Sequence, residues 1–159
     1  MSMSYAVRPI ELLLVEDSPT DLLMTREALE HAKVLLNTYS VEDGAEVLKF
    51  LRREGKHASV PRPDLILLDL NLPKKDGREV LAEIKSDPEL KTIPVVILTT
   101  SKAEEDILMA YRSHANCFIT KPVGFANFTE VIRAIERFWF SVATLPPSEA
   151  SDVLPRPAR

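Results

Sequence analysis

The sequence predicts an α/β fold in which five parallel strands form one doubly wound sheet with helices on both faces. Short apolar runs recur along the 159 residues, and each is followed by a segment with helical spacing. Most of these runs are continuous rather than alternating, which is typical of strands buried on both faces. Because right-handed crossovers bring the carboxyl ends of parallel strands to one edge, the polar residues that follow the runs should gather there.

The first two strand–helix pairs lie in the N-terminal third of the chain. An apolar run at residues 10–15 is followed by Ser18-Pro19, a helix cap with proline in the first turn, and by helical spacing over residues 20–33. Residues 35–41 form a weaker, partly alternating run, which indicates a strand nearer an edge of the sheet. A second helix is expected over residues 45–53.

The most informative run is Leu65–Asp69, in which four apolar residues precede an aspartate, between Pro63 and Pro73. It predicts the central strand, with its carboxylate at the edge where open α/β folds bind ligands. The remaining strands are predicted at residues 94–99 and 117–119, and the remaining helices at residues 78–86, 102–114 and 125–142. We expect Thr100 or Ser101 to cap the helix at residues 102–114.

Composition excludes several classes of protein. The chain is 45% hydrophobic and 28% charged with a formal net charge of -4, which argues against nonspecific nucleic-acid or anionic-membrane binding. Cys117 is the single cysteine, so neither an internal disulfide framework nor a multi-cysteine metal site can form. No signal peptide or membrane-spanning run is evident, and we expect a cytoplasmic protein.

One domain is expected over residues 8–145. The proline-rich residues 146–159 are expected to form a tail that is disordered or loosely docked. Because only this short tail follows the last predicted helix, we expect the protein to act through a partner rather than through an output domain.

The predicted sheet edge collects five polar residues, namely Glu16, Asp17, Asp69, Thr99 and Lys121. Clustered carboxylates repel one another and favour a cation, and oxygen ligands without histidine or cysteine favour Mg²⁺. The lysine and the hydroxyl suit the oxygens of a phosphoryl group, and an aspartate can itself be the nucleophile that forms an aspartyl phosphate. The sequence therefore predicts a site for Mg²⁺-dependent phosphoryl transfer.

Over about residues 10–142 the chain resembles response-regulator receiver domains, which have a flavodoxin-like (βα)5 fold. The resemblance is carried by Glu16-Asp17, by Asp69 with Leu72-Pro73 and Asp76-Gly77 after it, by Thr99, and by Lys121-Pro122. The order and spacing of these motifs also fit the family. Each motif alone is weak, but the combination is specific.

The resemblance implies a role for each of these residues. Asp69 would accept a phosphoryl group from a sensor histidine kinase, and the protein would slowly hydrolyse its own acyl phosphate without being an enzyme in any other sense. Glu16, Asp17, Asp69 and the backbone carbonyl of Asn71 would hold Mg²⁺, and Lys121 would contact the phosphoryl group. Because many family members have aspartate where this chain has Glu16, a water could separate that side chain from the metal.

The resemblance also implies a conformational switch. Thr99 would move toward the phosphoryl group and the ring of Phe118 would rotate inward, which would change the face built by the fourth helix, the fifth strand and the last helix. The Lys121-Pro122 peptide bond would be cis.

A finer resemblance, carried by residues 69–81, Leu98–Ser101 and Phe138-Trp139-Phe140, is to single-domain regulators partnered with bacterial phytochrome kinases. In that group the aromatic end of the last helix contributes to a homodimer. Three successive aromatic residues cannot all face one core, because neighbours on a helix point about 100° apart. The exposed ring could lie in a dimer interface or be covered by the chain's own tail.

Three other functions fit the sequence less well. A phosphatase of the haloacid-dehalogenase type needs a second aspartate two residues after the nucleophile, where this chain has Asn71. A nucleotide-binding flavodoxin-like protein needs a glycine-rich loop that the first turn lacks. The main alternative is a pseudo-receiver, an interaction module without phosphorylation, although all the key side chains except the aspartate replaced by Glu16 are present.

Overall fold

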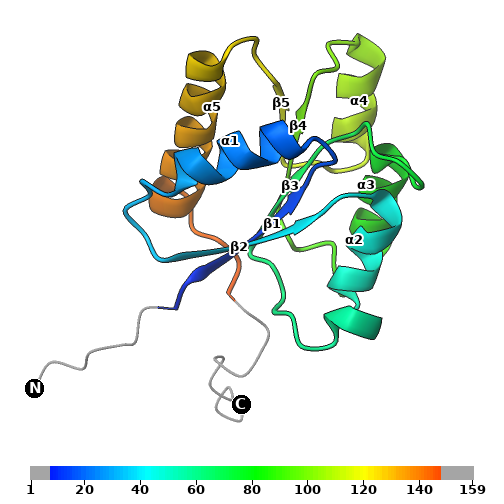
Figure 1. Ribbon diagram of the computed structural model, residues 1–159. Helices are drawn as coiled ribbons and strands as arrows, with labels where there is room; N and C mark the ends of the chain where they lie inside the picture. The colour runs from blue at the N-terminus through cyan, green and yellow to red at the C-terminus, as the bar shows by residue number, and fades with distance from the viewer. Residues whose placement is uncertain (1–7, 148–159) are drawn as a thin grey trace, which may run out of the picture.

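A computed structural model of the chain describes residues 8–147. Its centre is a parallel sheet with the strand order β2-β1-β3-β4-β5 (Figure 1). The strands are β1 (Ile10–Val15), β2 (Leu36–Val41), β3 (Leu65–Leu68), β4 (Val95–Thr99) and β5 (Cys117–Thr120). The helices are α1 (Pro19–Leu29), α2 (Gly44–Leu51), η1 (Gly55–His57), α3 (Gly77–Ser86), α4 (Glu104–Arg112), α5 (Phe125–Arg137) and the π-helical turn η2 (Phe138–Val142). The predicted doubly wound fold is confirmed.

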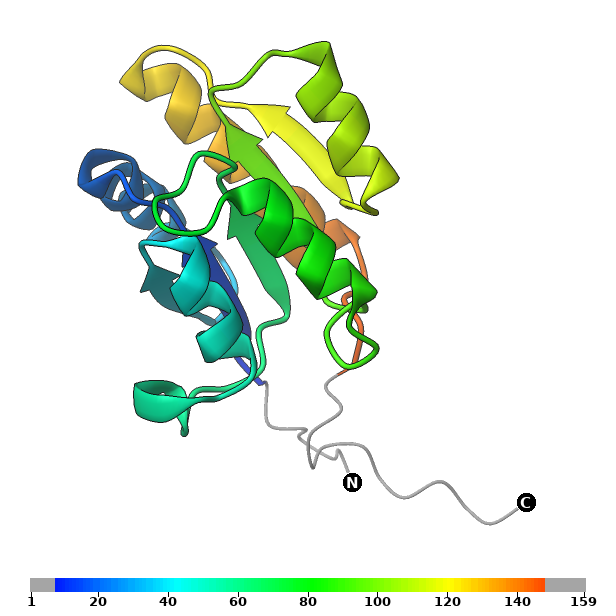
Figure 2. The same cartoon turned by 90° about the vertical axis from the view of Figure 1, so that its right-hand side faces the viewer.

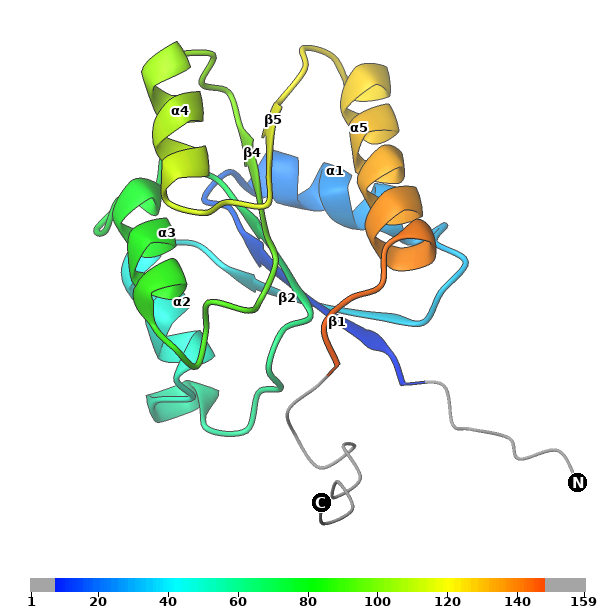
Figure 3. The ribbon, with the colours of Figure 1, turned by 180° about the vertical axis from the view of Figure 1, so that it is seen from behind.

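Helices cover both faces of the sheet. Helices α1 and α5 lie on one face and α2, α3 and α4 on the other, as the views from two opposite sides show (Figures 1 and 3). Each face buries its own apolar cluster, and β1, β3 and β4 contribute side chains alternately to both. All four residues of β3 are buried, which explains why this strand is a continuous apolar run. Among residues 8–147, no helix is long and apolar enough to cross a membrane.

The chain reverses its direction across the sheet between β1 and β3. After β1 it adds β2 on one side, and β3 then pairs with the other side of β1, with Val15 opposite Leu68. The carboxyl ends of β1 and β3 are therefore neighbours, and Asp69 N–H donates to the Val15 carbonyl at 3.1 Å. Ligands of open α/β folds bind at such a topological switch point. All five strands end at the same edge (Figure 2).

Several helix ends differ from the predictions, and the ends of α1 and α5 differ most. The first helix ends at Leu29 rather than at residue 33, and the backbone N–H of Glu30 closes it by bonding the carbonyls of Arg26 and Glu27. The last α-helix ends at Arg137, and residues 138–142 continue as a π-helical turn. Leu145, the last residue of the predicted domain, packs against the cluster beneath α1 and α5. Of the predicted tail, residues 148–159 lie outside the described part of the chain.

Candidate functional site

Three carboxylates from two strand ends meet at the switch point. Glu16 and Asp17 follow β1, Asp69 follows β3, and one oxygen of each lies within 4.8 Å of the others. Glu16 and Asp69 are buried, with 9% and 6% of their surface exposed, whereas Asp17 is exposed. Backbone amides orient the two buried groups, since Ser18 N–H donates to Glu16 Oε1 at 3.1 Å and Asn71 N–H donates to Asp69 Oδ1 at 3.1 Å.

Lys121 reaches into this cluster from the end of β5. Its Nζ donates to Glu16 Oε2 at 2.5 Å, to Asp21 Oδ2 at 2.8 Å and to Asp69 Oδ2 at 3.0 Å. Burial alone would lower the pKa of Lys121, but the hydrogen bonds to Asp21 and Glu16 and the charge of Asp69 outweigh burial and raise it. The ammonium group is therefore held charged among carboxylates.

Glu16 is the most perturbed acid of the site. Burial raises the pKa of Glu16 to about 7, although its hydrogen bond with Lys121 acts in the opposite direction. A buried carboxyl group with a pKa near neutrality can hold either a proton or a cation, because the free energies of the two states are similar near pH 7. The resting charge of the site therefore depends on what cation is available.

Asp21 is a residue of the site that sequence reasoning missed. It lies in the first turn of α1, where its backbone N–H donates to the Oγ of the N-cap residue Ser18 at 3.2 Å. Its carboxylate points the other way, to Lys121. The spacing Ser18-x-x-Asp21 is a helix-start pattern, so the sequence indicated a place for Asp21 in the first turn of the helix but not that its carboxylate would reach Lys121.

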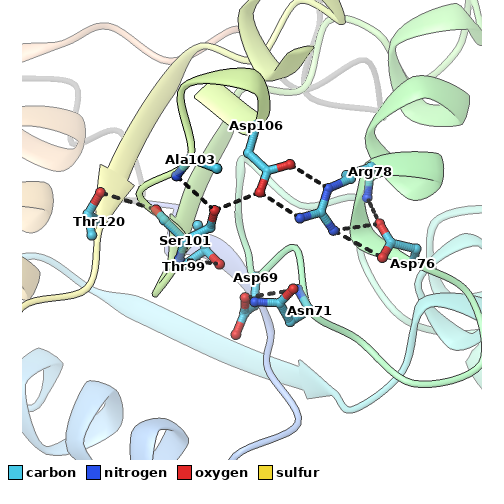
Figure 4. Close-up of polar contacts among 9 residues, drawn as sticks. All are labelled: Asp69, Asn71, Asp76, Arg78, Thr99, Ser101, Ala103, Asp106 and Thr120. Carbon is cyan, nitrogen blue, oxygen red and sulfur yellow. Dashed lines mark hydrogen bonds and ion pairs between the residues drawn. The ribbon is translucent and has the colours of Figure 1, made fainter. Parts of the chain in front are cut away.

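Thr99 ends β4 and is fully buried. Its Oγ1 accepts a long hydrogen bond of 3.5 Å from the backbone N–H of Ser101 (Figure 4). The predicted cap of the following helix is wrong, because α4 begins at Glu104 with Ala103 at the N-cap position. Ser101 instead accepts from the Ala103 N–H at 3.3 Å, which turns the chain before the helix starts.

Phe118 lies on the same face of the sheet as Thr99. It stands opposite Ile97 in the register of β4 and β5, and Thr99 is two residues further along β4. The ring is partly buried against the cluster beneath α2, α3 and α4. Its backbone N–H donates to the hydroxyl of Tyr111 in α4 at 3.2 Å, so β5 and α4 are tied together next to this ring.

One implied feature of the backbone is wrong. Within residues 8–147 there is no cis peptide bond, so Lys121-Pro122 is trans. The trans form is the lower-energy state of an X-Pro bond by about 0.5–1 kcal/mol, and here the trans chain already carries Lys121 Nζ to the carboxylates.

Gly77 allows α3 to start close to the buried aspartate. A Cβ at this position would lie 2.4 Å from the backbone oxygen of Asp69 and 2.6 Å from Leu70 Cα. The Gly77 N–H donates to the Leu70 carbonyl at 2.9 Å. The loop after β3 is therefore packed directly against the first turn of α3, and no larger residue fits there.

The three aromatic residues at the end of the last helix have different surroundings. Phe140 is buried with 8% of its surface exposed, Trp139 packs partly against the cluster beneath α1 and α5, and Phe138 is 51% exposed. Phe138 and Trp139 contact each other edge to face with their ring centroids 5.3 Å apart. The expectation that at least one of the three rings faces outward is confirmed for Phe138.

The donor set fits a hard divalent cation. Glu16, Asp17 and Asp69 supply carboxylate oxygens and no nitrogen or sulfur, and their close approach leaves more negative charge than Lys121 neutralises. Mg²⁺ is commonly bound by one or two carboxylates together with phosphate oxygens. The site thus combines a metal-binding cluster, a carboxylate, a lysine and, at the next strand end, a buried hydroxyl.

Many known proteins are similar to this chain in sequence and in fold. The response regulator Rcp1 of Synechocystis sp. (strain ATCC 27184 / PCC 6803 / Kazusa) is 47% identical over 138 residues, which cover 87% of this chain and 94% of Rcp1. A crystal structure of the Mn²⁺-bound form of Rcp1 covers 87% of this chain and all of the solved chain, with a TM-score of 0.85. The phosphorylated cyanobacterial phytochrome response regulator RcpA is 52% identical, covering 88% of this chain and all of its own, with a TM-score of 0.86.

The family description covers most of the domain. Residues 12–133 match the response regulator receiver domain. This range begins inside β1, ends inside α5 and contains each of the strand-end residues described above. Together with the five-stranded sheet and the acidic cluster, the match shows that the chain belongs to the response regulator receiver domain family.

Proposed function

We propose that this protein accepts a phosphoryl group on Asp69 from the phosphohistidine of a sensor histidine kinase, in a reaction that depends on Mg²⁺. The observation that carries the proposal is the position of Asp69. Its buried carboxylate lies beside Glu16 and Asp17, and the ammonium of Lys121 is 3.0 Å from its Oδ2. A nucleophile, a metal cluster and a phosphate-binding cation are thus within reach of one another.

Asp69 is the nucleophile of the proposed reaction. One of its carboxylate oxygens attacks phosphorus in line with the leaving group, so a P–O bond forms as the P–N bond to the kinase imidazole breaks. The hydrogen bond from Asn71 N–H fixes the plane of the carboxylate, and burial removes water that would compete for the phosphoryl group. Mg²⁺, held by Glu16, Asp17 and Asp69 with the backbone carbonyl of Asn71, would neutralise charge on the phosphoryl oxygens.

Lys121 changes partners in this reaction. In the structure its Nζ bonds three carboxylates at 2.5–3.0 Å. A phosphoryl group on Asp69 adds about 1.5–2 negative charges in the same place and offers three acceptor oxygens. Lys121 can then bond a phosphoryl oxygen while it keeps Asp21 or Glu16 as a second partner.

Phosphorylation would be read out on the face formed by α4, β5 and α5. Thr99 and Phe118 share the face of the sheet that α4 covers, and Tyr111 links α4 to β5 beside Phe118. A movement of Thr99 toward the phosphoryl group leaves space on this face for the ring to follow. The added charge thus biases the equilibrium between two arrangements of one surface.

The kinase we propose as the donor belongs to a bacterial phytochrome. Both RcpA, which is a phytochrome response regulator by name, and Rcp1 align over nearly their whole length with this chain at 47–52% identity. This pairing is tested by comparing phosphotransfer from a phytochrome kinase and from an unrelated kinase. Equal rates from the two would contradict a phytochrome partner.

We also propose that the protein forms a homodimer through the surface around Phe138 and Trp139, whereas Phe140, which was expected in the same interface, is buried in the protein's own core. The 51% exposed ring of Phe138 and the 72% exposed Val142 leave an apolar surface at the end of α5. Phe138→Ala should raise the dimer dissociation constant by roughly tenfold or more, because buried aromatic residues dominate interfaces. Light scattering measures the change, and an unchanged mass at every concentration would exclude this surface.

Acceptance of the phosphoryl group is tested by intact-mass spectrometry after incubation with acetyl phosphate and Mg²⁺. The wild type should gain one phosphoryl group, and Asp69→Asn should gain none while it keeps its fold by circular dichroism. A variant that is still phosphorylated would place the acceptor elsewhere. A wild type that binds Mg²⁺ but gains no mass even in a short assay would favour the pseudo-receiver.

A further inference from the structure

A second charged cluster lies on the other side of the loop that follows Asp69. The guanidinium of Arg78, in the first turn of α3, forms a two-pronged contact with Asp106 in the first turn of α4 (Figure 4). Its Nε donates to Asp106 Oδ1 and its Nη2 to Asp106 Oδ2, both at 2.8 Å. The remaining prong, Nη1, donates to both oxygens of Asp76 at 3.1 and 3.0 Å.

Asp106 also contacts the loop between β4 and α4. The hydroxyl of Ser101 donates to Asp106 Oδ2 at 2.6 Å. Ser101 is also bonded through its backbone, since its N–H donates to Thr99 Oγ1 at 3.5 Å and its carbonyl accepts from the Thr120 hydroxyl at 3.4 Å. One serine therefore connects the charged cluster to Thr99.

The two ends of this chain of contacts differ in how firmly they are held. Arg78 follows Gly77, which packs against the backbone of Asp69 and Leu70 with no space for a side chain. At the other end Ala103, the N-cap residue of α4, has no side-chain oxygen to hold the helix start. Ser101 and Asp106 supply that hold instead, so the start of α4 depends on these side-chain hydrogen bonds, whereas the start of α3 is fixed by backbone packing.

We propose that Arg78 and Asp106 are positioning residues that hold Ser101, and with it the loop after Thr99, in the resting arrangement, and that this contact slows the acceptance of a phosphoryl group by Asp69. The inference rests on the proposed function, because it assigns these residues a role in that reaction. A loop that follows Thr99 toward Asp69 draws Ser101 away from Asp106, so the contact exists only before the shift. Each bond of the chain favours the resting state.

The geometry of the Arg78–Asp106 ion pair favours a contact that restrains the loop. Both ions keep a rigid, planar, two-pronged arrangement, and Asp106 is only 16% exposed in its side chain. The hydrogen bonds from Arg78 and Ser101 lower the pKa of Asp106 to about 2, so the carboxylate stays charged at any pH at which the protein works. Partly exposed ion pairs of this kind typically shift an equilibrium by up to about fivefold.

The test compares initial rates of phosphorylation by acetyl phosphate at saturating Mg²⁺. Asp106→Ala removes the contact. Ser101→Ala leaves Arg78 and Asp106 paired but cuts the link between Asp106 and the loop, together with the hydrogen bond from the Ala103 N–H. Both should accept the phosphoryl group faster than the wild type, by about two- to fivefold, with unchanged Mg²⁺ affinity. Arg133→Ala is the matched control, because it removes an exposed ion pair with Glu130 in α5 far along the sequence from this loop, and it should leave the rate unchanged.

A merely structural role would lower stability without raising the rate, so unchanged or slower phosphorylation in both variants overturns the proposal. Amide hydrogen exchange of the peptide that contains Ser101 and Ala103, measured without any phosphodonor, gives an independent readout. Exchange there should rise in both variants and not in Arg133→Ala. If even the wild type accepts no phosphoryl group, the proposed function fails, and unchanged exchange would then reject the contact as a restraint on the loop as well.

Discussion

The two charged clusters beside the loop after β3 differ in how fully the charged side chains of each cluster are paired with one another. The first brings Glu16, Asp17, Asp21 and Asp69 near Lys121, so its negative charge exceeds what the chain itself supplies to balance it. The second brings Arg78 between Asp76 and Asp106. It too has one more carboxylate than cation, but both carboxylates are hydrogen-bonded by Arg78 and the cluster is partly exposed (Figure 4).

This difference indicates that the first cluster binds ligands and that the second holds two segments of the chain together. A buried cluster with excess negative charge binds cations and responds strongly when a phosphoryl group arrives, because its energy depends on what enters it. A partly exposed cluster whose carboxylates are already hydrogen-bonded gains little from anything that enters and serves to hold two segments at a fixed distance. We call the cluster around Asp69 the reactive cluster and the cluster around Arg78 the holding cluster. Asp69 and Arg78 are close in the sequence, because Asp69 directly follows β3 and Arg78 lies in the first turn of α3.

Removal of Lys121 should give the largest effect on stability. Lys121→Ala leaves Glu16 and Asp69 buried without their cation, and loss of one partner from a buried ion cluster costs about 3–5 kcal/mol. Urea unfolding at pH 8 measures the loss. Added Mg²⁺ should restore more stability to the variant than to the wild type, because the metal supplies the missing charge.

Lys49 provides the control for this comparison. Lys49→Ala removes an exposed lysine that lies 3.7 Å from Glu46 on the surface of α2, and such pairs contribute about 0–1 kcal/mol. An equal loss in the two lysine variants would show that the cluster around Asp69 is no more sensitive than a surface pair.

Gly77 joins the two clusters, and a substitution there should disturb both. In Gly77→Ala the new Cβ would stand 2.4 Å from the Asp69 oxygen, so the loop or the start of α3 must shift. Overpacking of this kind costs about 1–3 kcal/mol. We expect lower stability together with slower phosphorylation, measured by urea unfolding and acetyl phosphate labelling. Gly55→Ala, at the first residue of η1 where a Cβ meets no other atom, should cost stability through its backbone strain but leave phosphorylation unchanged.

The fold and the first cluster could be predicted from the sequence because both depend on strand ends. Burial on both faces makes β3 a continuous apolar run, and parallel strands carry Glu16, Asp69 and Lys121 to one edge whatever the details of packing. The helix ends were predicted less well. Residues 138–142 form a π-helical turn, and no spacing in the sequence distinguishes that turn from the α-helix before it.

The second cluster depends on tertiary packing, which local patterns do not encode. Arg78 and Asp106 are 28 positions apart, and they meet because α3 and α4 cover the same face of the sheet and the long Arg78 side chain spans from one helix to the other. Asp21 was missed for a related reason, since the angle at which α1 crosses the sheet decides where its first turn points. Sequence motifs thus predict the residues that act at strand ends and miss those that support them from helices.

Metal binding should depend on pH through Glu16. Because burial raises the pKa of this carboxyl to about 7, its proton stabilises the folded state below the ordinary value of 4.5, and that contribution is lost as pH rises through 7. Mg²⁺ must displace the proton, so its apparent affinity should rise about tenfold per pH unit below pH 7 and level off above it. Calorimetric titration at several pH values measures this rise, and Glu16→Gln should flatten it. A rise that persists unchanged in that variant would assign the proton to another group.

The holding cluster should give the smallest loss of stability. Arg78→Lys keeps the positive charge but cannot bond both oxygens of Asp106 while it also reaches Asp76. Because the pair is partly exposed, the loss should be below about 1 kcal/mol at low salt and smaller still at 1 M salt, measured by urea unfolding. The reactive cluster should show the reverse order of effects, with Mg²⁺ affecting stability far more than salt does. A loss at Arg78 as large as that at Lys121, or a strong Mg²⁺ dependence of the Arg78 variant, would mean that the two clusters work as one.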